Sequence, residues 1–155
     1  MKKDKIKDSK LLLLQLKELI NDEKDVIAQL ANASSLLKMF YHDAINWVGF
    51  YRLVDNGDLI LGPFQGKIAC VRLKKGIGVC QKAVIDQKTT IIDDVHQFSG
   101  HIACDAESNS EIVIPMIVDD NVVWVLDIDS PNYAQFDHID SEFLTEFCQI
   151  LKDIL

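Results

Sequence analysis

Three stretches of the chain repeat their apolar residues with the 3.6-residue period of an α-helix. The first covers residues 9–21 and carries six leucines, and the second covers residues 23–42. The third begins at residues 137–141 and has apolar side chains along one stripe, at Ile139, Phe143, Phe147, Ile150 and Ile154. The pattern therefore predicts two helices at the start of the chain and one at its end.

Between these helices the pattern changes to that of β-strands. Aromatic and β-branched residues fill residues 46–53, and residues 59–64 form a partner strand after the turn-forming pair Asn56-Gly57. Two almost continuously apolar stretches, residues 111–118 and 122–129, predict a hairpin covered on both faces. The remaining predictions are short strands at residues 69–73 and 89–92, a helix at 76–87, and a polar loop at 93–110.

This order of elements predicts one α+β domain with a mainly antiparallel sheet. Residues 1–45 supply the N-terminal helices, residues 46–136 the sheet with its inserted helix and loops, and residues 137–155 the C-terminal helix. We expect the terminal helices to pack together on one face of the sheet. The loops on the other face are then free to form a pocket.

Composition and charge narrow the class of protein. The length of 155 residues and the hydrophobic content of 48% fit one globular domain. A net charge of −8, from 16 Lys and Arg against 24 Asp and Glu, disfavours nucleic acid and anionic membranes as partners. No apolar run approaches the ~18 residues of a membrane span, and no signal peptide is recognisable. We therefore expect a cytoplasmic protein whose cysteines are by default thiols and do not form a structural disulfide framework.

Four cysteines are the first candidates for chemistry. No two of them form a C-x-x-C pair, which disfavours a zinc ribbon or a thioredoxin-type motif. Cys148 falls on the packed side of the last helix and reads as a core residue. Cys104 lies in the polar loop, where a thiolate is accessible for redox or nucleophilic chemistry. A metal site made of His96, His101 and Cys104 is a weaker alternative, since no fourth ligand is evident.

Acidic residues are the second group of candidates. Asp127 and Asp129 alternate with apolar neighbours, so both carboxylates lie on one face of their strand, and Glu111 begins the neighbouring strand. Two interpretations stay open from the pattern alone. The acids are either a solvated strand end or a site for a cation such as a ligand ammonium group.

Several separated sequence blocks together resemble a known family. They are GPFQGK at 62–67, AC at 69–70, GIGVC at 76–80, DVH at 94–96, GHIACD at 100–105, SNSEIV at 108–113 and LDIDSP at 126–131. In this order they are similar to the free methionine-(R)-sulfoxide reductases, which are built on a GAF domain. The resemblance covers residues from about 46 to the C-terminus, and the two preceding helices fit the usual start of a GAF domain.

The resemblance implies a fold and a set of roles. The fold would be a six-stranded antiparallel sheet with helices on one side and a loop-covered pocket on the other. Cys104 matches the nucleophile, Cys70 the resolving cysteine, and Cys80 a third thiol in disulfide exchange. The remaining matches are pocket residues, with acids at Glu111, Asp127 and Asp129 and aromatic rings at Trp47 and Tyr51.

The implied reaction is thiol-dependent reduction of free L-methionine (R)-sulfoxide. Cys104 attacks the substrate sulfur, Glu111 or Asp129 supplies a proton to the oxygen, and the resulting sulfenic acid condenses to a disulfide. No cofactor is implied beyond an external dithiol such as thioredoxin. A homodimer is a candidate assembly, because GAF domains often pair through their terminal helices.

Two qualifications accompany this resemblance. A GAF domain acting alone as a small-ligand or redox sensor is the competing interpretation, because GAF domains commonly bind ligands without catalysis. The family also usually has a small residue where this chain has Trp124. We expect Trp124 to point into the core beneath the helices rather than into the pocket.

Overall fold

The structure is a computed structural model that describes residues 2–100 and 104–155. Its main helices are α1 (Lys2–Asn21), α2 (Val26–Tyr41), α3 (Val79–Asp86) and α4 (His138–Leu151). Its strands are β1 (Trp47–Leu53), β2 (Leu59–Gln65), β3 (Arg72–Leu73), β4 (Thr90–Ile92), β5 (Ser110–Val118) and β6 (Asn121–Ser130). Short 3₁₀ turns follow α2 and α4, and another lies between β4 and β5.

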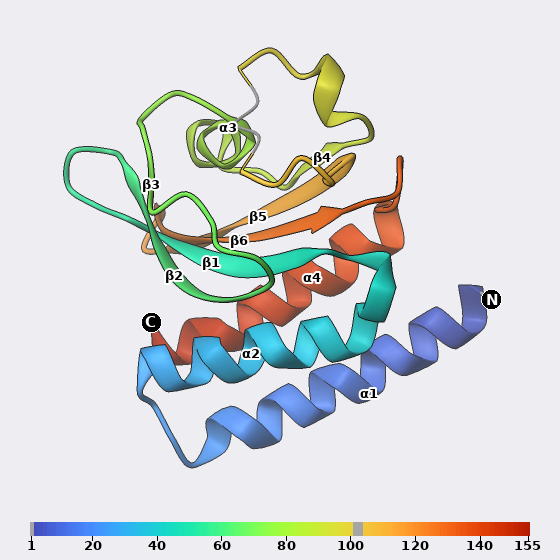
Figure 1. The fold of residues 1–155 in the computed structure, drawn as a ribbon. Coiled ribbons are helices and arrows are strands. Elements are labelled where there is room, and N and C mark those ends of the chain that lie inside the picture. The colour runs from blue at the N-terminus through green and yellow to red at the C-terminus, as the bar shows by residue number, and fades with distance from the viewer. Residues whose placement is uncertain (1, 101–103) are drawn as a thin grey trace.

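The six strands form one sheet in the order β3-β2-β1-β6-β5-β4, and every neighbouring pair is antiparallel. β1 and β6 therefore lie at the centre, although almost 70 residues separate them along the chain (Figure 1). The β5–β6 turn uses Asp119 and Asp120, both with positive φ, as tight hairpin turns require. The predicted α+β class and the antiparallel six-stranded sheet are confirmed.

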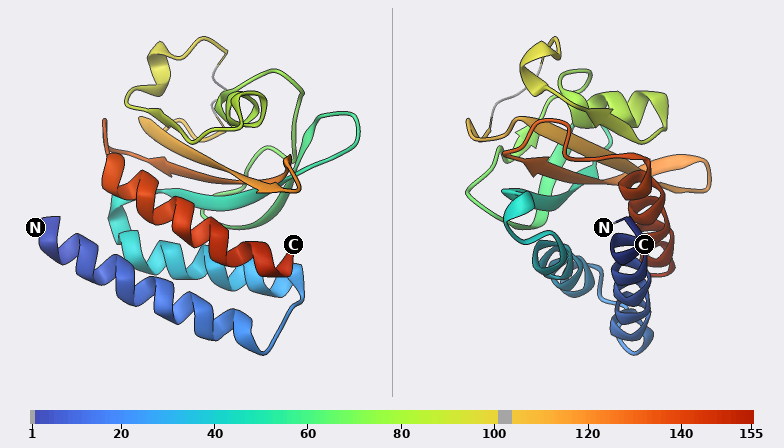
Figure 2. Two further views of the ribbon diagram at one scale, coloured as in Figure 1. Left: turned by 180° about the vertical axis from the view of Figure 1, so that it is seen from behind. Right: turned by 90° about the vertical axis from the view of Figure 1, so that its right-hand side faces the viewer.

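The helices are divided between the two faces of this sheet (Figure 2). α2 packs on β1 and β2, and α4 packs on β5 of the same face. α1 packs on α2 and α4 as an outer layer, so both terminal helices lie on one side, as predicted. The inserted helix α3 packs on β5 and β6 from the opposite side, together with the long loops.

Some predicted boundaries are wrong. The strand expected at 69–73 is reduced to Arg72–Leu73, because the chain leaves the edge of the sheet after β2 and returns to it at Val71, whose carbonyl accepts from the Leu61 N–H at 2.9 Å. The first helix begins at Lys2 rather than at residue 9, although its first turns lack an apolar stripe. Its start is held to the body of the fold by Lys5, whose Nζ donates to Asp140 at 2.6 Å. α3 begins only at Val79, because Gly78 before it has a φ of 97° and is non-helical.

The helical side of the fold also encloses a buried polar network. The Asp140 side chain is fully buried, and it accepts hydrogen bonds from Lys5 Nζ and from Tyr41 Oη at 2.8 Å. It also caps α4 by accepting from the backbone N–H of Asp137 at 2.9 Å. One carboxylate thus connects α1, α2 and α4, and its neighbours satisfy it, as a buried charge requires.

Side-chain alternation along the strands separates two apolar clusters. Val48, Phe50, Leu126 and Ile128 face the helices, whereas their neighbours on the same strands face α3 and the loops. Trp124 belongs to the helix-facing cluster and is 7% exposed, which confirms the expectation that it is a core residue. The space for its ring comes from Gly62 on β2, where an added Cβ would lie 2.6 Å from Trp124 Cζ3.

No helix in the described part of the chain is both long and apolar enough to span a membrane.

Candidate active site

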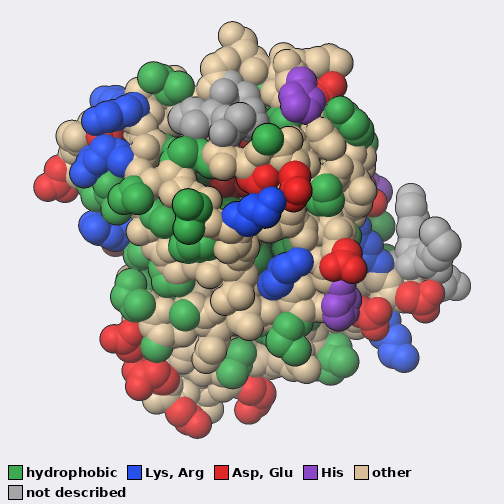
Figure 3. Space-filling model, in the orientation of Figure 1, with side chains coloured by type: hydrophobic (Ala, Val, Ile, Leu, Met, Phe, Trp, Pro, Cys, Tyr) green, Lys and Arg blue, Asp and Glu red, His purple; other side chains and the backbone are tan. Residues whose placement is uncertain are grey.

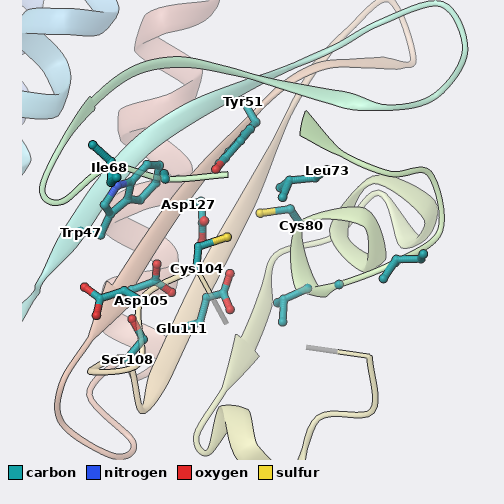
Figure 4. Close-up of a pocket in the computed structure, with 15 residues that line it drawn as sticks. Trp47, Tyr51, Ile68, Leu73, Cys80, Cys104, Asp105, Ser108, Glu111 and Asp127 are labelled. Atoms are coloured by element: carbon teal, nitrogen blue, oxygen red, sulfur yellow. The ribbon is translucent and has the colours of Figure 1, made fainter. Parts of the chain in front are cut away.

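A pocket lies on the sheet face opposite α2 and α4 (Figure 4). Strands β1, β5 and β6 form its floor, and the segments before α3 and around residue 104 form its walls. Its lining is Trp47, Tyr51, Ile68, Ala69, Leu73, Ile77, Gly78, Val79, Cys80, Cys104, Asp105, Ser108, Glu111, Asp127 and Asp129. The pocket therefore brings together residues from five separate parts of the sequence.

Three carboxylic acids stand side by side on the pocket floor. Strand register explains this placement, because Glu111 on β5 pairs with Asp129 on β6, and Asp127 lies two residues before Asp129 on the same face. Glu111 is only 5% exposed and Asp127 only 6%. Glu111 and Asp127 therefore do not form a solvated strand end, and Asp129 beside them is half-buried.

The clustering changes the protonation of these acids. Burial and the neighbouring carboxylates raise the pKa of Glu111 and of Asp129 well above the usual range. Burial also raises the pKa of Asp127, but hydrogen bonds from Glu111 and Cys80 oppose this rise. The arrangement therefore favours Glu111 as the protonated member of this pair, donating to Asp127. A second oxygen of Asp127, Oδ1, is buried and accepts no hydrogen bond from the described residues.

Cys80 closes the floor of the pocket from the first turn of α3. It is 4% exposed, and its thiol shares a hydrogen bond with Asp127. Burial and the nearby acids raise the pKa of this thiol well above its ordinary value. Cys80, Glu111 and Asp127 have ligand atoms within 4.8 Å of one another, close enough to share a metal ion. Asp127 is hydrogen-bonded to both Cys80 and Glu111. The three side chains therefore form a thiol–carboxyl network in which Cys80 and Glu111 are the hydrogen-bond donors.

A disulfide between Cys70 and Cys104 closes one side of the pocket. It joins the segment after β2 to the loop before β5, across 34 residues of sequence. Cys104 is exposed and lines the pocket, and Cys70 is half-buried. The disulfide occupies Cys104 Sγ, so this thiol is not available to ligate a metal in this state. His96 Nε2 lies 2.9 Å from Asn109 Oδ1, and His101 lies outside the described residues.

Two aromatic side chains of β1 position the segment that carries Cys70. Trp47 Nε1 donates to the carbonyl of Lys67 at 3.2 Å, and Tyr51 Oη donates to the carbonyl of Cys70 at 2.9 Å. The two rings stack with centroids 5.9 Å apart. Burial, followed by the charge of Asp127, raises the pKa of Tyr51, so its hydroxyl remains a neutral donor. Both rings also line the pocket.

Asn46 holds the opposite wall, the loop that carries Cys104. Its Nδ2 donates to Asp105 Oδ2 at 2.9 Å and to Ser108 Oγ at 3.0 Å. Its backbone N–H donates to the carbonyl of Asp129 at 3.0 Å. Asn46 therefore ties this loop to the start of β1 and the end of β6. The sequence analysis did not identify Asn46 as a site residue, because these contacts span 59 or more residues and no local pattern reports them.

The structure gathers the residues that the sequence analysis proposed for the site. Seven of them line the pocket, and Cys70 is bonded to one of the seven; the set is Trp47, Tyr51, Cys70, Cys80, Cys104, Glu111, Asp127 and Asp129. Cys148 is buried in the helix-facing cluster, as its position on the last helix predicted. Trp124 belongs to that cluster as well, and the described pocket lining does not include it.

The chain is similar in sequence to several known proteins. The sequence profile of the GAF domain matches residues 23–155. A free methionine-R-sulfoxide reductase of Escherichia coli is 50% identical over 137 residues, which cover 88% of this chain and 82% of that protein. Protein YtsP of Bacillus subtilis is 52% identical and covers 98% of this chain and 93% of its own.

The fold is also similar to those of solved structures. The free methionine-R-sulfoxide reductase of Neisseria meningitidis in complex with its substrate has a TM-score of 0.89 at 40% identity, covering 94% of this chain and 87% of that chain. The reduced form of the Staphylococcus aureus protein has a TM-score of 0.89 at 51% identity, covering 95% of this chain and 94% of that chain. The chain therefore belongs to the GAF domain family, within its group of free methionine-R-sulfoxide reductases.

Proposed function

We propose that this protein reduces free L-methionine (R)-sulfoxide to L-methionine with electrons from an external dithiol. The proposal rests on one observation, which is that a disulfide and a cluster of carboxyl groups lie in the same pocket. A disulfide that contains an exposed cysteine lies beside three clustered carboxyl groups, of which Glu111 and Asp127 are buried and Asp129 is half-buried. The disulfide corresponds to the oxidised end of a thiol cycle, and the carboxyl groups supply both a proton and a site for a cation.

The acids account for the choice of a free amino acid. The buried Asp127 Oδ1 lacks a hydrogen-bond donor among the described residues, and a substrate ammonium group would provide one. A methionine sulfoxide within a peptide has an amide in place of this ammonium group. It would leave the charge of Asp127 buried without a counter-charge, which costs free energy. The Trp47 and Tyr51 rings would contact the apolar methyl and side-chain carbons of the substrate.

The chemical step begins with reduced Cys104. Its thiolate attacks the sulfoxide sulfur while Glu111 or Asp129 protonates the sulfoxide oxygen. The oxygen is transferred to Cys104 Sγ, so the substrate gains two electrons and leaves as methionine, and Cys104 becomes a sulfenic acid. Burial raises the pKa of both acids well above the usual range, which favours the protonated form that this step needs.

The second half of the cycle restores the thiols. The Cys70 thiol attacks the sulfenic sulfur, water leaves, and the Cys70–Cys104 disulfide forms. Its occurrence here supports Cys70 as the first resolving cysteine, whereas the Cys80 thiol is buried and bonded to Asp127. We assign Cys80 to later disulfide exchange. A dithiol protein such as thioredoxin then reduces the disulfide, which fits the cytoplasm, where such dithiols are kept reduced.

A pair of cysteine variants tests the proposal. Pre-reduced Cys104→Ser is incubated with free methionine sulfoxide and dithiothreitol, and methionine is measured by chromatography. We expect no methionine from this variant and parental amounts from Cys148→Ala, whose sulfur is buried outside the pocket. Parental turnover by Cys104→Ser would remove Cys104 from the role of nucleophile. If the folded, reduced parent also forms no methionine, the protein is a ligand-binding GAF domain rather than an enzyme.

A further inference from the structure

Exposed apolar side chains lie next to Cys70 in the sequence and on the wall of the pocket that Cys104 lines. Ile68 is 92% exposed and Val71 is 69% exposed, and both lie within two residues of Cys70. Ile77, on the wall before α3, is 50% exposed. Single exposed apolar residues are common, but a group of them beside one reactive bond marks a contact surface.

The same segment has an unusual charge. Residues 66–78 contain Lys67, Arg72, Lys74 and Lys75 and no acid, in a chain with a net charge of −8. Asp58 balances part of this charge, since its carboxylate accepts from Arg72 at 2.9 Å and lies 3.5 Å from Lys74 Nζ. Lys67 Nζ also lies 3.1 Å from Glu107 Oε2, although 64% of the Lys67 side chain is exposed. Lys74 keeps 69% of its side chain exposed. Figure 3 shows basic and hydrophobic side chains together on the left of this face.

We propose that Ile68, Val71 and the lysines of residues 66–78 form the docking surface for a protein dithiol with an acidic rim. The inference rests on the proposed function, in which this disulfide is reduced once per turnover. Reduction requires an incoming thiolate to approach one sulfur in line with the S–S bond. A protein that brings this thiolate must first bind at the surface around the bond, and the basic and apolar character described above fits an acidic partner.

The position of the surface also selects the sulfur that is attacked. Because Ile68 and Val71 flank Cys70, the partner thiolate attacks Cys70 Sγ, the S–S bond breaks, and Cys104 leaves as a thiolate. The second partner thiol then attacks the mixed disulfide and releases the Cys70 thiol. Two electrons and two protons pass from the partner dithiol to the cysteine pair. Cys104 is thus the first of the two cysteines to be released, ready for the next substrate.

Val71 offers the cleanest test, because it is exposed and does not belong to the described pocket lining. Thioredoxin, its reductase and NADPH serve as the protein dithiol, and dithiothreitol serves as a small dithiol that needs no docking surface. The variants are Val71→Asp and the milder Val71→Ser. Ile85→Asp is the matched control, since Ile85 is 66% exposed on α3 and also lies outside the described lining.

We expect Val71→Asp to raise the KM for thioredoxin about tenfold, equivalent to ~1.4 kcal/mol of lost binding. Val71→Ser should raise it less, and the dithiothreitol-driven rate of both variants should stay parental. Ile85→Asp should change neither quantity. A parental KM for thioredoxin in both Val71 variants overturns the docking surface while leaving the proposed function intact. An equal loss with both reductants also overturns it, because Val71 would then act on substrate turnover.

Failure of the proposed function has a different signature. The parent protein would then form no methionine with either reductant, and the docking proposal would fall with it. A second copy of this chain is the other candidate occupant of the surface. A change in oligomeric state caused by Val71→Asp, with an unchanged KM for thioredoxin, would assign the surface to that contact instead.

Discussion

Replacement of Asp127 by Asn tests how the pocket would recognise a free amino acid. The change keeps the shape of the side chain and removes its negative charge. Asp127 Oδ1 is buried and accepts no hydrogen bond from the described residues, so the proposed substrate ammonium group is its natural partner. A hydrogen bond to a charged group contributes roughly 1.5–3 kcal/mol net. Its loss should therefore weaken substrate binding by about 10- to 150-fold.

Binding is measured by calorimetry with L-methionine (R)-sulfoxide in a Cys104→Ser background, where turnover is prevented. The same titrations are repeated with the N-acetylated substrate, which has no ammonium group, so that the side chain and the substrate group are removed separately and together. It should bind weakly to the parent, and Asp127→Asn should weaken it little further. Asp140→Asn is the matched control, because Asp140 is fully buried but belongs to the network beneath the helices. This variant should lose thermal stability and keep parental affinity.

Two results would refute this reasoning. The first is an Asp127→Asn affinity within about threefold of the parent, which is less than a charged hydrogen bond contributes. The second is equal binding of the free and N-acetylated substrates by the parent. Either result would show that Asp127 does not face the ammonium group, and that the carboxyl cluster serves only proton transfer.

Three further predictions concern the thiols, the acids and the core. Cys70→Ser should complete about one turnover with the thioredoxin system and then stall, as its sulfenic acid has lost its resolving thiol; sustained turnover by chromatographic assay would assign that role to Cys80. Burial raises the pKa of Glu111 in the folded protein. As the pH rises above ~4.3, Glu111 loses its proton in the unfolded chain before it does so in the folded protein, and the free energy of unfolding therefore falls. Urea unfolding should therefore show that Glu111→Gln gains stability relative to the parent between pH 5 and pH 8. A difference in unfolding free energy that stays constant over this range would contradict the prediction. Gly62→Ala should destabilise the protein by about 1–3 kcal/mol in calorimetry, because the new Cβ would overlap Trp124; an unchanged melting temperature would count against the tight packing of that ring.

Local patterns predicted much of the fold because they record which face of each element is buried. The continuous apolar runs at 111–118 and 122–129 correspond to β5 and β6, the strands that carry all three acids. The segment at 69–73 was overextended as a strand because its composition is strand-like. Its path is set by Trp47 and Tyr51, whose side chains donate to the carbonyls of Lys67 and Cys70 across 20 and 19 residues of sequence.

The candidate site was predictable to the extent that its residues follow a period or a family motif. The period of two placed Asp127 and Asp129 on one face, and the resemblance supplied the roles of the cysteines. Neither source indicated Asn46, because its amide acts on the Cys104 loop through contacts formed only in the folded chain. The sequence pattern also left open whether the acids are solvated or bind a ligand. The burial of Glu111 and Asp127 answers this question, and it depends on how the loops cover the sheet.

The central claim is stereospecific reduction of the free amino acid, and one measurement tests it directly. Purified, pre-reduced protein is given racemic free methionine sulfoxide, thioredoxin, its reductase and NADPH, and both NADPH loss and methionine are followed. The account predicts that consumption stops near half of the racemate, with one methionine formed per NADPH oxidised and only the S epimer left. Absence of methionine with folded, reduced protein, or consumption of both epimers, would contradict it.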